Sequence, residues 1–218
     1  MSNTNVVAVI DYGVGNLFSV QRALEHCGAS VILVDDPEKL KQASKVLLPG
    51  VGAFPEAMLA LSRNGMDQAI KEYAGSGAPL FGICLGMQML LDNSNEFGFA
   101  SGLGLIPGTV EPIPTRNQSG QRFKVPHIGW SDLIYPEGRG SWDGTLLSSI
   151  DVSNNAVYFV HSYMAVPKHH NHRIADCRYG DTSVAAVIGK DNVWGAQFHP
   201  EKSGKVGLSM LRNFVNLV

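Results

Sequence analysis

Short apolar runs alternate with segments of helical periodicity at the start of the chain. Residues 6–11, VVAVID, are largely apolar and lead into the turn-rich stretch DYGVGN. Residues 17–28, LFSVQRALEHCG, then carry apolar positions at helical spacing and stop at Gly28. An apolar run of this length predicts a strand, and a glycine after a periodic segment predicts the end of a helix. We therefore expect the order strand, loop, helix.

The same alternation continues to about residue 94. Three more apolar runs predict buried strands: SVILVDD at 30–36, KVLLPG at 45–50 and APLFGIC at 78–84. The segments between and after them predict a short polar helix or turn at 37–45, helical structure over 55–77 and a helix at 85–94. Apolar strands that alternate with helices are typical of a parallel sheet covered on both faces. The predicted fold class is α/β with a mainly parallel sheet.

The second half of the chain has a different pattern. From about residue 103, short runs are separated by several glycines and by Pro107, Pro112, Pro114, Pro126 and Pro136. The runs FKVPHIGWSDLIY, VYFVHSYMAV, HRIADCRY and SVAAVIGKDNVWGAQFHP predict antiparallel or mixed strands. Residues 204–218 have helically spaced apolar positions and predict a last helix on the sheet. Because we find no internal repeat or linker, we expect residues 1–218 to form a single domain.

The composition is that of an ordinary globular protein. Hydrophobic residues make up 44% and charged residues 17%, which excludes a disordered chain. The 17 Lys and Arg against 19 Asp and Glu give a net charge of -2 without a basic run, so no nucleic-acid partner is expected. No window approaches the roughly 18 apolar residues of a membrane span. Residues 1–13 also lack a secretory signal pattern, so we expect a cytoplasmic protein without membrane contact.

Cys84 stands out among the three cysteines. Cys27, Cys84 and Cys177 are an odd number at wide spacings, as expected for free thiols in a reducing compartment. In GICLGMQ, Cys84 lies between a predicted strand and a predicted helix, with Gly82 and Gly86 around it. Small neighbours permit a tight strand-to-helix turn, and the positive end of the helix dipole favours a thiolate. We predict that Cys84 is a nucleophile and that the other two cysteines are buried and inert.

Two further motifs can complete a site around this thiol. A thiol nucleophile needs a base and a carboxylate that orients the base. The segment WGAQFHPEKS supplies His199 and Glu201 after an apolar run, and PGVGAF at 49–54 offers Gly50 and Gly52 for a close backbone approach to an oxyanion. The carboxyl ends of parallel strands meet at one crevice, so we expect these motifs to converge on Cys84.

Together, PGVGAF, GICLGMQ and QFHPEKS resemble the class I glutamine amidotransferases, which carry a Cys, His and Glu triad on a flavodoxin-like sheet. Within that family the chain is similar to the glutaminase subunits of imidazole glycerol phosphate synthase. The motifs that carry this similarity are DYGVGNL at 11–17, GLGLIPG at 102–108, KVPHIGW at 124–130, FVHSY at 159–163 and HPEKSG at 199–204. The resemblance runs nearly from end to end.

The resemblance implies a function and a set of site residues. Cys84 would attack the side-chain amide of glutamine, with His199 as base and Glu201 as its orienting group, to give a glutamyl thioester and then glutamate. The remaining implied roles are an oxyanion hole at Val51 and Gly52 and glutamine binding at Gly50, Leu85, Gln88 and Glu96. The ammonia would pass to a separate (β/α)8 barrel, the cyclase subunit, which forms a heterodimer with this chain and closes an imidazole ring in histidine biosynthesis.

Two departures from the family pattern leave the ammonia acceptor open. Ser131 stands where the family usually has Asn after Gly-Trp, and Met164 follows Tyr163 where a tyrosine pair is common. A paralogue that supplies ammonia for amidination of a surface-polysaccharide sugar is therefore an alternative to the histidine enzyme. Further alternatives are a stand-alone cysteine hydrolase and a catalytically silent binding subunit, and the intact Cys, His and Glu set argues against the second.

Neither a metal nor a cofactor is expected. The histidines of PKHHNHR at 167–173 lack supporting carboxylates at the spacing of a metal site, so a solvated loop is predicted. DYGVGN lacks the third glycine of a dinucleotide-binding loop, and no Walker pattern occurs. Trp130, Trp142 and Trp194 are expected to be core or interface residues.

Overall fold

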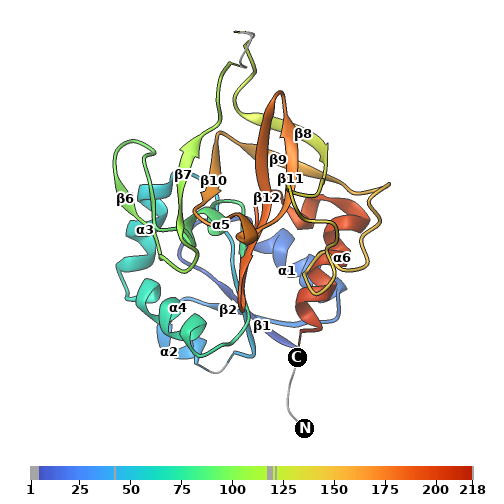
Figure 1. Ribbon diagram of the computed structural model, residues 1–218. Helices are drawn as coiled ribbons and strands as arrows, with labels where there is room; N and C mark the ends of the chain where they lie inside the picture. Colours follow the sequence, from blue (N-terminus) through green and yellow to red (C-terminus); the bar gives the residue numbers. More distant parts are fainter. Residues whose placement is uncertain (1–4, 42, 117–119, 121, 218) are drawn as a thin grey trace.

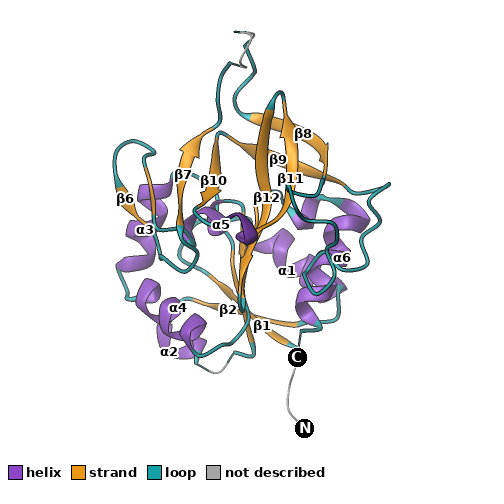
Figure 2. Ribbon diagram, in the orientation of Figure 1, coloured by secondary structure: helices purple, strands orange, loops and turns teal. Residues whose placement is uncertain are grey.

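A seven-stranded sheet forms the centre of the molecule (Figures 1 and 2). The computed structural model describes residues 5–41, 43–116, 120 and 122–217. In spatial order the strands are β11 (Arg173–Tyr179), β12 (Thr182–Lys190), β13 (Val193–Ala196), β4 (Leu80–Ile83), β3 (Lys45–Leu48), β1 (Val6–Ile10) and β2 (Ser30–Val34). The five strands from β13 to β2 are parallel, and β11 and β12 are antiparallel to their neighbours. The predicted α/β fold with a mainly parallel sheet is confirmed.

Helices cover both faces of this sheet, as Figure 1 shows. One face carries α1 (Leu17–His26) and α6 (Gly204–Val215). The other carries α2 (Pro37–Leu40), α3 (Phe54–Ser62), α4 (Met66–Gly75) and α5 (Leu85–Met89). Side chains alternate across a strand, so Val7 and Val9 of β1 enter the first core, while Ala8 and Ile10 enter the second. Each face of the sheet thus has its own apolar core.

Two smaller sheets lie at the end of the molecule opposite the chain termini (Figure 1). Strands β10 (Tyr163–Pro167), β7 (Gly108–Pro112), β5 (Asn93–Ser94) and β6 (Ala100–Ser101) form one of them. The other is an antiparallel ribbon of β8 (His127–Asp132) and β9 (Ala156–His161). Short 3-10 turns η1 (His170–His172) and η2 (Pro200–Lys202) complete the fold. The mixed strands predicted for the second half of the chain are confirmed.

The strand predicted within residues 30–36 is confirmed as β2, but the prediction that it is buried is wrong. Strand β2 lies at the edge of the sheet, and Ile32 and Leu33 are 40% and 45% exposed. An edge strand has a neighbour on one side only, and the helices do not cover its outer residues fully. Apolar composition alone does not distinguish an edge strand from a central one.

Three predicted helical segments differ from the observed helices. The periodic stretch 55–77 is broken by Gly65, whose φ of +76° separates α3 from α4. The helix predicted over 85–94 ends at Met89, because Asn93 and Ser94 pair with β7. The last helix, predicted to reach residue 218, ends at Val215.

The sequence predicts a single domain over residues 1–218, and this range includes residues that the structure does not describe. Residues 1–4, 42, 117–119, 121 and 218 lie outside the described residues, so the single domain over 1–218 stays a prediction. Among the described helices, none is long and apolar enough to cross a membrane.

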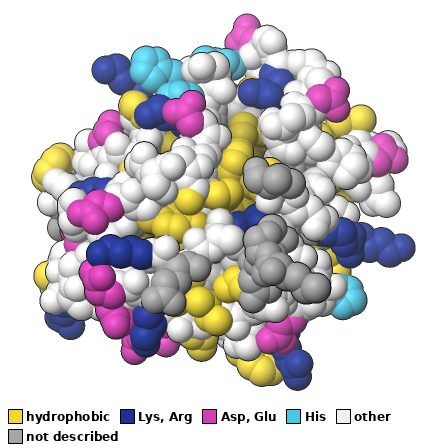
Figure 3. Space-filling view, turned by 90° about the horizontal axis from the view of Figure 1, so that it is seen from below, with side chains coloured by type: hydrophobic (Ala, Val, Ile, Leu, Met, Phe, Trp, Pro, Cys, Tyr) yellow, Lys and Arg dark blue, Asp and Glu magenta, His cyan; other side chains and the backbone are white. Residues whose placement is uncertain are grey.

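Figure 3 shows the face near the termini, where apolar side chains gather in a central depression and charged side chains of both signs surround it.

Candidate active site

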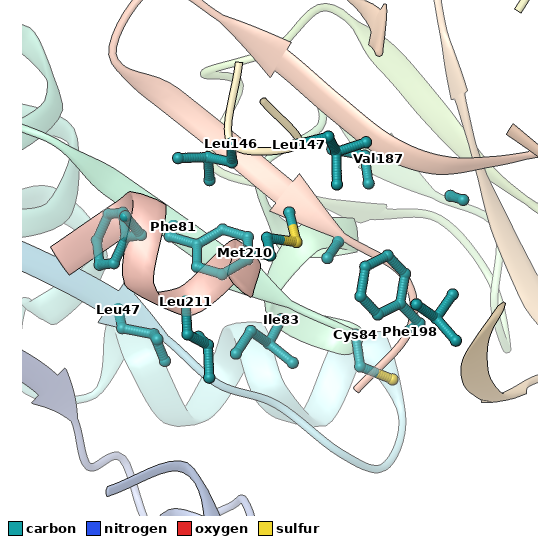
Figure 4. Packing of buried hydrophobic residues seen from close by; sticks show 14 of the residues in the cluster. Leu47, Phe81, Ile83, Cys84, Leu146, Leu147, Val187, Phe198, Met210 and Leu211 are labelled. Carbon is teal, nitrogen blue, oxygen red and sulfur yellow. The ribbon is translucent and has the colours of Figure 1, made fainter. Parts of the chain in front are cut away.

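Cys84 lies at the turn between β4 and α5. Its backbone has φ +56° and ψ -112°, a conformation that is costly for a residue with a side chain. The Cys84 N–H donates to the Ala196 carbonyl of β13 at 2.7 Å, and the Cys84 carbonyl accepts from the Gln88 N–H at 3.2 Å. In Figure 4 Cys84 lies at the edge of the first apolar core, beside Phe198. The strained turn is therefore held from both sides.

Glycines around this turn permit direct backbone packing. A Cβ atom on Gly86 would lie 1.9 Å from the Leu48 carbonyl oxygen, and one on Gly82 would lie 2.6 Å from the Gly86 carbonyl oxygen. A Cβ atom on Gly50 would lie 2.8 Å from the Gly86 nitrogen. These glycines are required because the end of β3, the end of β4 and the start of α5 touch through their backbones.

His199 and Glu201 follow β13 and form a buried pair. The His199 Nδ1 lies 2.8 Å from the Glu201 Oε1, and the Glu201 side chain is only 1% exposed. Ser203 fixes the segment, because its hydroxyl donates to the His199 carbonyl at 2.7 Å. With Nδ1 bonded to the carboxylate, Nε2 is the ring nitrogen left for Cys84.

The electrostatics of this pair favour a charged imidazole. Burial alone would lower the pKa of His199, but its interactions with Cys84 and Glu201 outweigh burial and raise the pKa to about 9. An imidazole that interacts with a sulfur on one side and a carboxylate on the other can take a proton from the sulfur and return it elsewhere. The arrangement suits proton transfer at Cys84.

A pocket of about 370 Å³ opens at Cys84. Seven of the nine residues predicted for the site line it: Val51, Gly52, Cys84, Leu85, Gln88, Glu96 and His199. The other two lie outside the lining, because Glu201 contacts the ring of His199 and Gly50 is buried against α5. The structure thus brings the sequence motifs together, while the individual roles stay predictions.

Glu96 joins two walls of the pocket. Its Oε2 accepts a hydrogen bond from the Phe54 N–H at 2.7 Å, at the first residue of α3. A carboxylate at a helix N-terminus is stabilised by the helix dipole. Gly52, with φ +96°, lies two residues before Phe54, so this bond ties the predicted oxyanion turn to the segment that carries Glu96.

His161 also lines the pocket, but both of its ring nitrogens are occupied. Its Nδ1 lies 2.8 Å from the Tyr163 carbonyl oxygen, and its Nε2 lies 3.2 Å from the His127 Nδ1. Burial lowers the pKa of His161 to about 4. Of the two histidines in the lining, His199 is therefore the one available to act as a base.

Sequence reasoning did not single out Gln197. This side chain is fully buried, its Nε2 lies 3.9 Å from the Cys84 Sγ, and its Oε1 accepts from the Gln88 Nε2 at 3.0 Å. The signal that was available is its place in QFHPEKS, two residues before His199 at the end of an apolar strand.

The predicted loop at 167–173 contains η1, and the described residues contain no group of three or more His, Cys, Asp or Glu that could hold a metal.

The tryptophans differ in their surroundings. Trp142 is buried and its indole N–H donates to the Ile174 carbonyl at 3.0 Å, as expected for a core residue. Trp130 is 58% exposed on β8, where its ring contacts the Tyr158 ring of β9 at a centroid distance of 6.0 Å, and its exposed part is available to an interface.

The model of the glutamine amidotransferase class-I family matches residues 8–217. The chain belongs to this family. A protein from Legionella pneumophila (strain Lens) called imidazole glycerol phosphate synthase subunit HisH 1 is 48% identical over 211 residues, which cover 97% of this chain and 99% of the relative. A HisH protein from Geobacillus sp. (strain WCH70) is 44% identical and covers 98% of this chain and 97% of that protein. The resemblance seen in the motifs is confirmed.

Solved structures share the fold of this amidotransferase. The structure of PurLQS from Thermotoga maritima superposes with a TM-score of 0.68 at 22% identity and covers 97% of both chains. A crystal structure of another glutamine amidotransferase gives a TM-score of 0.67 at 20% identity, with 97% of this chain and 99% of that chain covered.

Replacing Gly86 should disrupt the turn that carries Cys84. The added Cβ of Gly86→Ala meets the Leu48 carbonyl, so we expect the free energy of unfolding to fall by at least about 2 kcal/mol in urea denaturation. Gly75→Ala, where the Cβ meets nothing within 4 Å, is the matched control and should change stability by less than about 1 kcal/mol. Equal stability of the two variants would contradict the packing described here.

The three cysteines should differ in reactivity. Cys84 lines a pocket, whereas burial raises the pKa of Cys27 and raises that of Cys177 to about 12. At pH 7.5 we expect iodoacetamide to modify Cys84 at least about tenfold faster than the other two, as peptide mass spectrometry can measure. The denatured protein, with all three thiols accessible, is the control. Faster labelling of Cys27 than of Cys84 would be the contrary result.

Proposed function

We propose that the chain is the glutaminase subunit of an imidazole glycerol phosphate synthase in histidine biosynthesis. It hydrolyses glutamine to glutamate and ammonia and passes the ammonia to a cyclase subunit. The observation that carries the proposal is the near full-length similarity, at 44% and 48% identity, to two proteins called HisH, in a chain whose pocket holds Cys84 beside the His199 and Glu201 pair.

In the proposed mechanism His199 moves protons between Cys84 and the substrate. Its Nε2 holds the proton that came from the thiol, so that Cys84 reacts as a thiolate beside the imidazolium and attacks the side-chain amide carbon of glutamine. The imidazolium then protonates the amide nitrogen, the C–N bond breaks, and ammonia leaves a glutamyl thioester on Cys84. His199 next takes a proton from water, which attacks the thioester and releases glutamate and the thiol. Glu201 holds the imidazole ring and stabilises its charge.

The other predicted residues receive roles that fit their places in the pocket. Backbone N–H groups at Val51 and Gly52 stabilise the oxyanion, and the Glu96 carboxylate binds the α-ammonium group of glutamine with the help of Gln88. Leu85 contributes an apolar wall at the start of α5. Gly50 contributes by its lack of a side chain, which lets the oxyanion turn approach α5.

The partner is proposed to be a (β/α)8 barrel cyclase that forms a heterodimer over the pocket mouth. Apolar side chains are exposed nearby, with Val51 40% exposed at the pocket and Ile128 60% exposed on β8. Burial of such exposed apolar side chains by a partner would stabilise the complex.

The three cysteines are free thiols, which supports a cytoplasmic location. The Ser131 and Met164 departures do not alter the proposed triad.

Glutamate release should depend on both Cys84 and the partner. We expect the purified chain to release glutamate slowly from glutamine and to be stimulated at least about tenfold by the cyclase barrel with its phosphoribosyl substrate. Cys84→Ala should abolish the activity in both conditions. Equal turnover with and without the barrel would favour a stand-alone hydrolase, and absence of stimulation by this barrel would favour a paralogue with another acceptor.

The pH dependence should report the His199 imidazolium. Because the pKa of His199 is raised to about 9, we expect kcat/KM for glutamine to fall as the pH rises through about 9, where the imidazolium loses its proton. Glu201→Gln removes one of the interactions that raise this pKa. It should move the fall to lower pH and reduce kcat/KM by at least about 100-fold. A variant profile that descends at the wild-type pH would contradict this assignment.

A further inference from the structure

A series of hydrogen bonds runs from the β8–β9 ribbon toward the pocket. The Ser131 Oγ lies 3.0 Å from the His127 Nε2, and the His127 Nδ1 lies 3.2 Å from the His161 Nε2. The His161 Nδ1 lies 2.8 Å from the carbonyl oxygen of Tyr163. We call Ser131, His127 and His161 the histidine relay. The mechanism above does not use any of its three side chains.

The direction of each bond in the relay follows from its last acceptor. A carbonyl oxygen can only accept, so the His161 Nδ1 must carry the proton of the bond to Tyr163. A neutral His161 then has an unprotonated Nε2, which must accept from the His127 Nδ1. A neutral His127 is left with an unprotonated Nε2, to which the Ser131 hydroxyl donates. Both histidines are thus Nδ1–H tautomers.

The surroundings keep both rings neutral. The His127 ring stacks on Phe159 and Tyr179, with centroid distances of 4.8 Å and 4.1 Å. Burial lowers the pKa of His127 and of His161 to about 4. At neutral pH each ring therefore has one donor and one acceptor, as the relay requires.

The relay ends at a carbonyl that also binds Gln88. The Gln88 Nε2 donates to the Tyr163 carbonyl at 3.0 Å and to the Gln197 Oε1 at 3.0 Å. Both amide N–H bonds of Gln88 are therefore used within the protein. The Gln197 Nε2 lies 3.9 Å from the Cys84 Sγ, so the side-chain amides of Gln88 and Gln197 connect the Tyr163 carbonyl to the predicted nucleophile. Gln88 can offer a ligand only its oxygen, which accepts and cannot donate.

We propose that the three side chains of the histidine relay are positioning residues. They hold the Tyr163 carbonyl and, through it, the Gln88 amide. The oxygen of this amide then accepts from the ligand, so that the amide selects a ligand with an ammonium donor. The inference rests on the proposed function, because the ligand that places such a donor beside Gln88 and Glu96 is glutamine with its α-ammonium group. An analogue without the α-amino group offers no donor to the Gln88 oxygen or to the Glu96 carboxylate, whose Oε2 keeps only its bond from the Phe54 N–H, in a buried site. Buried unpaired polar groups reject such an analogue strongly.

The tautomers can be tested without any activity. In the chain with 15N-labelled histidine at pH 7, two-bond proton–nitrogen NMR spectra should show a protonated Nδ1 and an unprotonated Nε2 for both His127 and His161, with signals assigned from His127→Gln and His161→Asn. Most neutral histidines in solution favour the other tautomer, so the signature is specific. An Nε2–H tautomer at either position would overturn the relay.

Ligand selection can be tested in a Cys84→Ser background, which removes turnover by the thiol. Calorimetric titration should give at least about 100-fold tighter binding of glutamine than of its analogue without the α-amino group. His161→Leu, which removes the donor to Tyr163, should reduce this preference about tenfold. His161→Asn, whose amide can replace that donor, should retain it, and Ser131→Ala should weaken it less than His161→Leu.

The outcomes separate this proposal from the proposed function. An unchanged preference in a folded His161→Leu chain would overturn the role of the relay while leaving the glutaminase intact. Failure of the Cys84→Ser chain to bind glutamine would overturn the proposed function and, with it, the selection of an α-ammonium group. The NMR result would still decide whether the relay itself exists.

Discussion

The close backbone packing around Cys84 is the constraint on which the rest of the site depends. The Gly86 Cα faces the Leu48 carbonyl so closely that a methyl group would lie 1.9 Å from its oxygen. This contact joins the end of β3 to the start of α5 and lets the chain turn at Cys84 with a positive φ. The hydrogen bond from Cys84 to Ala196 adds β13, which leads to His199. Nucleophile, predicted oxyanion turn and base are therefore positioned by one set of backbone contacts.

Histidines near the pocket differ because their partners differ. His199 has Cys84 and Glu201 beside it, and these interactions raise its pKa to about 9 despite its burial. His161 has a carbonyl and another histidine as partners, and burial lowers its pKa to about 4. The first ring is suited to carry a proton during the reaction, and the second is suited to hold a fixed tautomer. His199 and His161 are the same residue type, and it is their different surroundings that suit the first to the proposed catalytic role and the second to the proposed positioning role.

Much of the fold and the site could be predicted from the sequence. The alternation of apolar runs and helical segments predicted the parallel strands, and the glycines around Cys84 predicted a tight turn, because both signals are local. The exposure of Ile32 was missed because edge position depends on the strand order of the whole sheet. The end of α5 was missed because Asn93 and Ser94 pair with β7, a strand that comes later in the chain.

The side chains of the relay were beyond sequence reasoning for a related reason. His127 and His161 are 34 residues apart and meet only because β8 and β9 pair with these two residues opposite each other. Gln88 and Gln197 are 109 residues apart and meet where α5 approaches β13. Each lies in a motif that marks the pocket, but no motif states which polar atoms bond to each other. Those contacts come from the tertiary structure.

In the proposed mechanism, Cys84 forms a glutamyl thioester from glutamine. Rapid acid quench of the chain with glutamine, followed by peptide mass spectrometry, tests it most directly. We expect one adduct with the mass of glutamine less ammonia, on the peptide that contains Cys84 and absent from the peptides of Cys27 and Cys177. A chain that releases glutamate with no such adduct, or one that retains activity after Cys84→Ala, would contradict it.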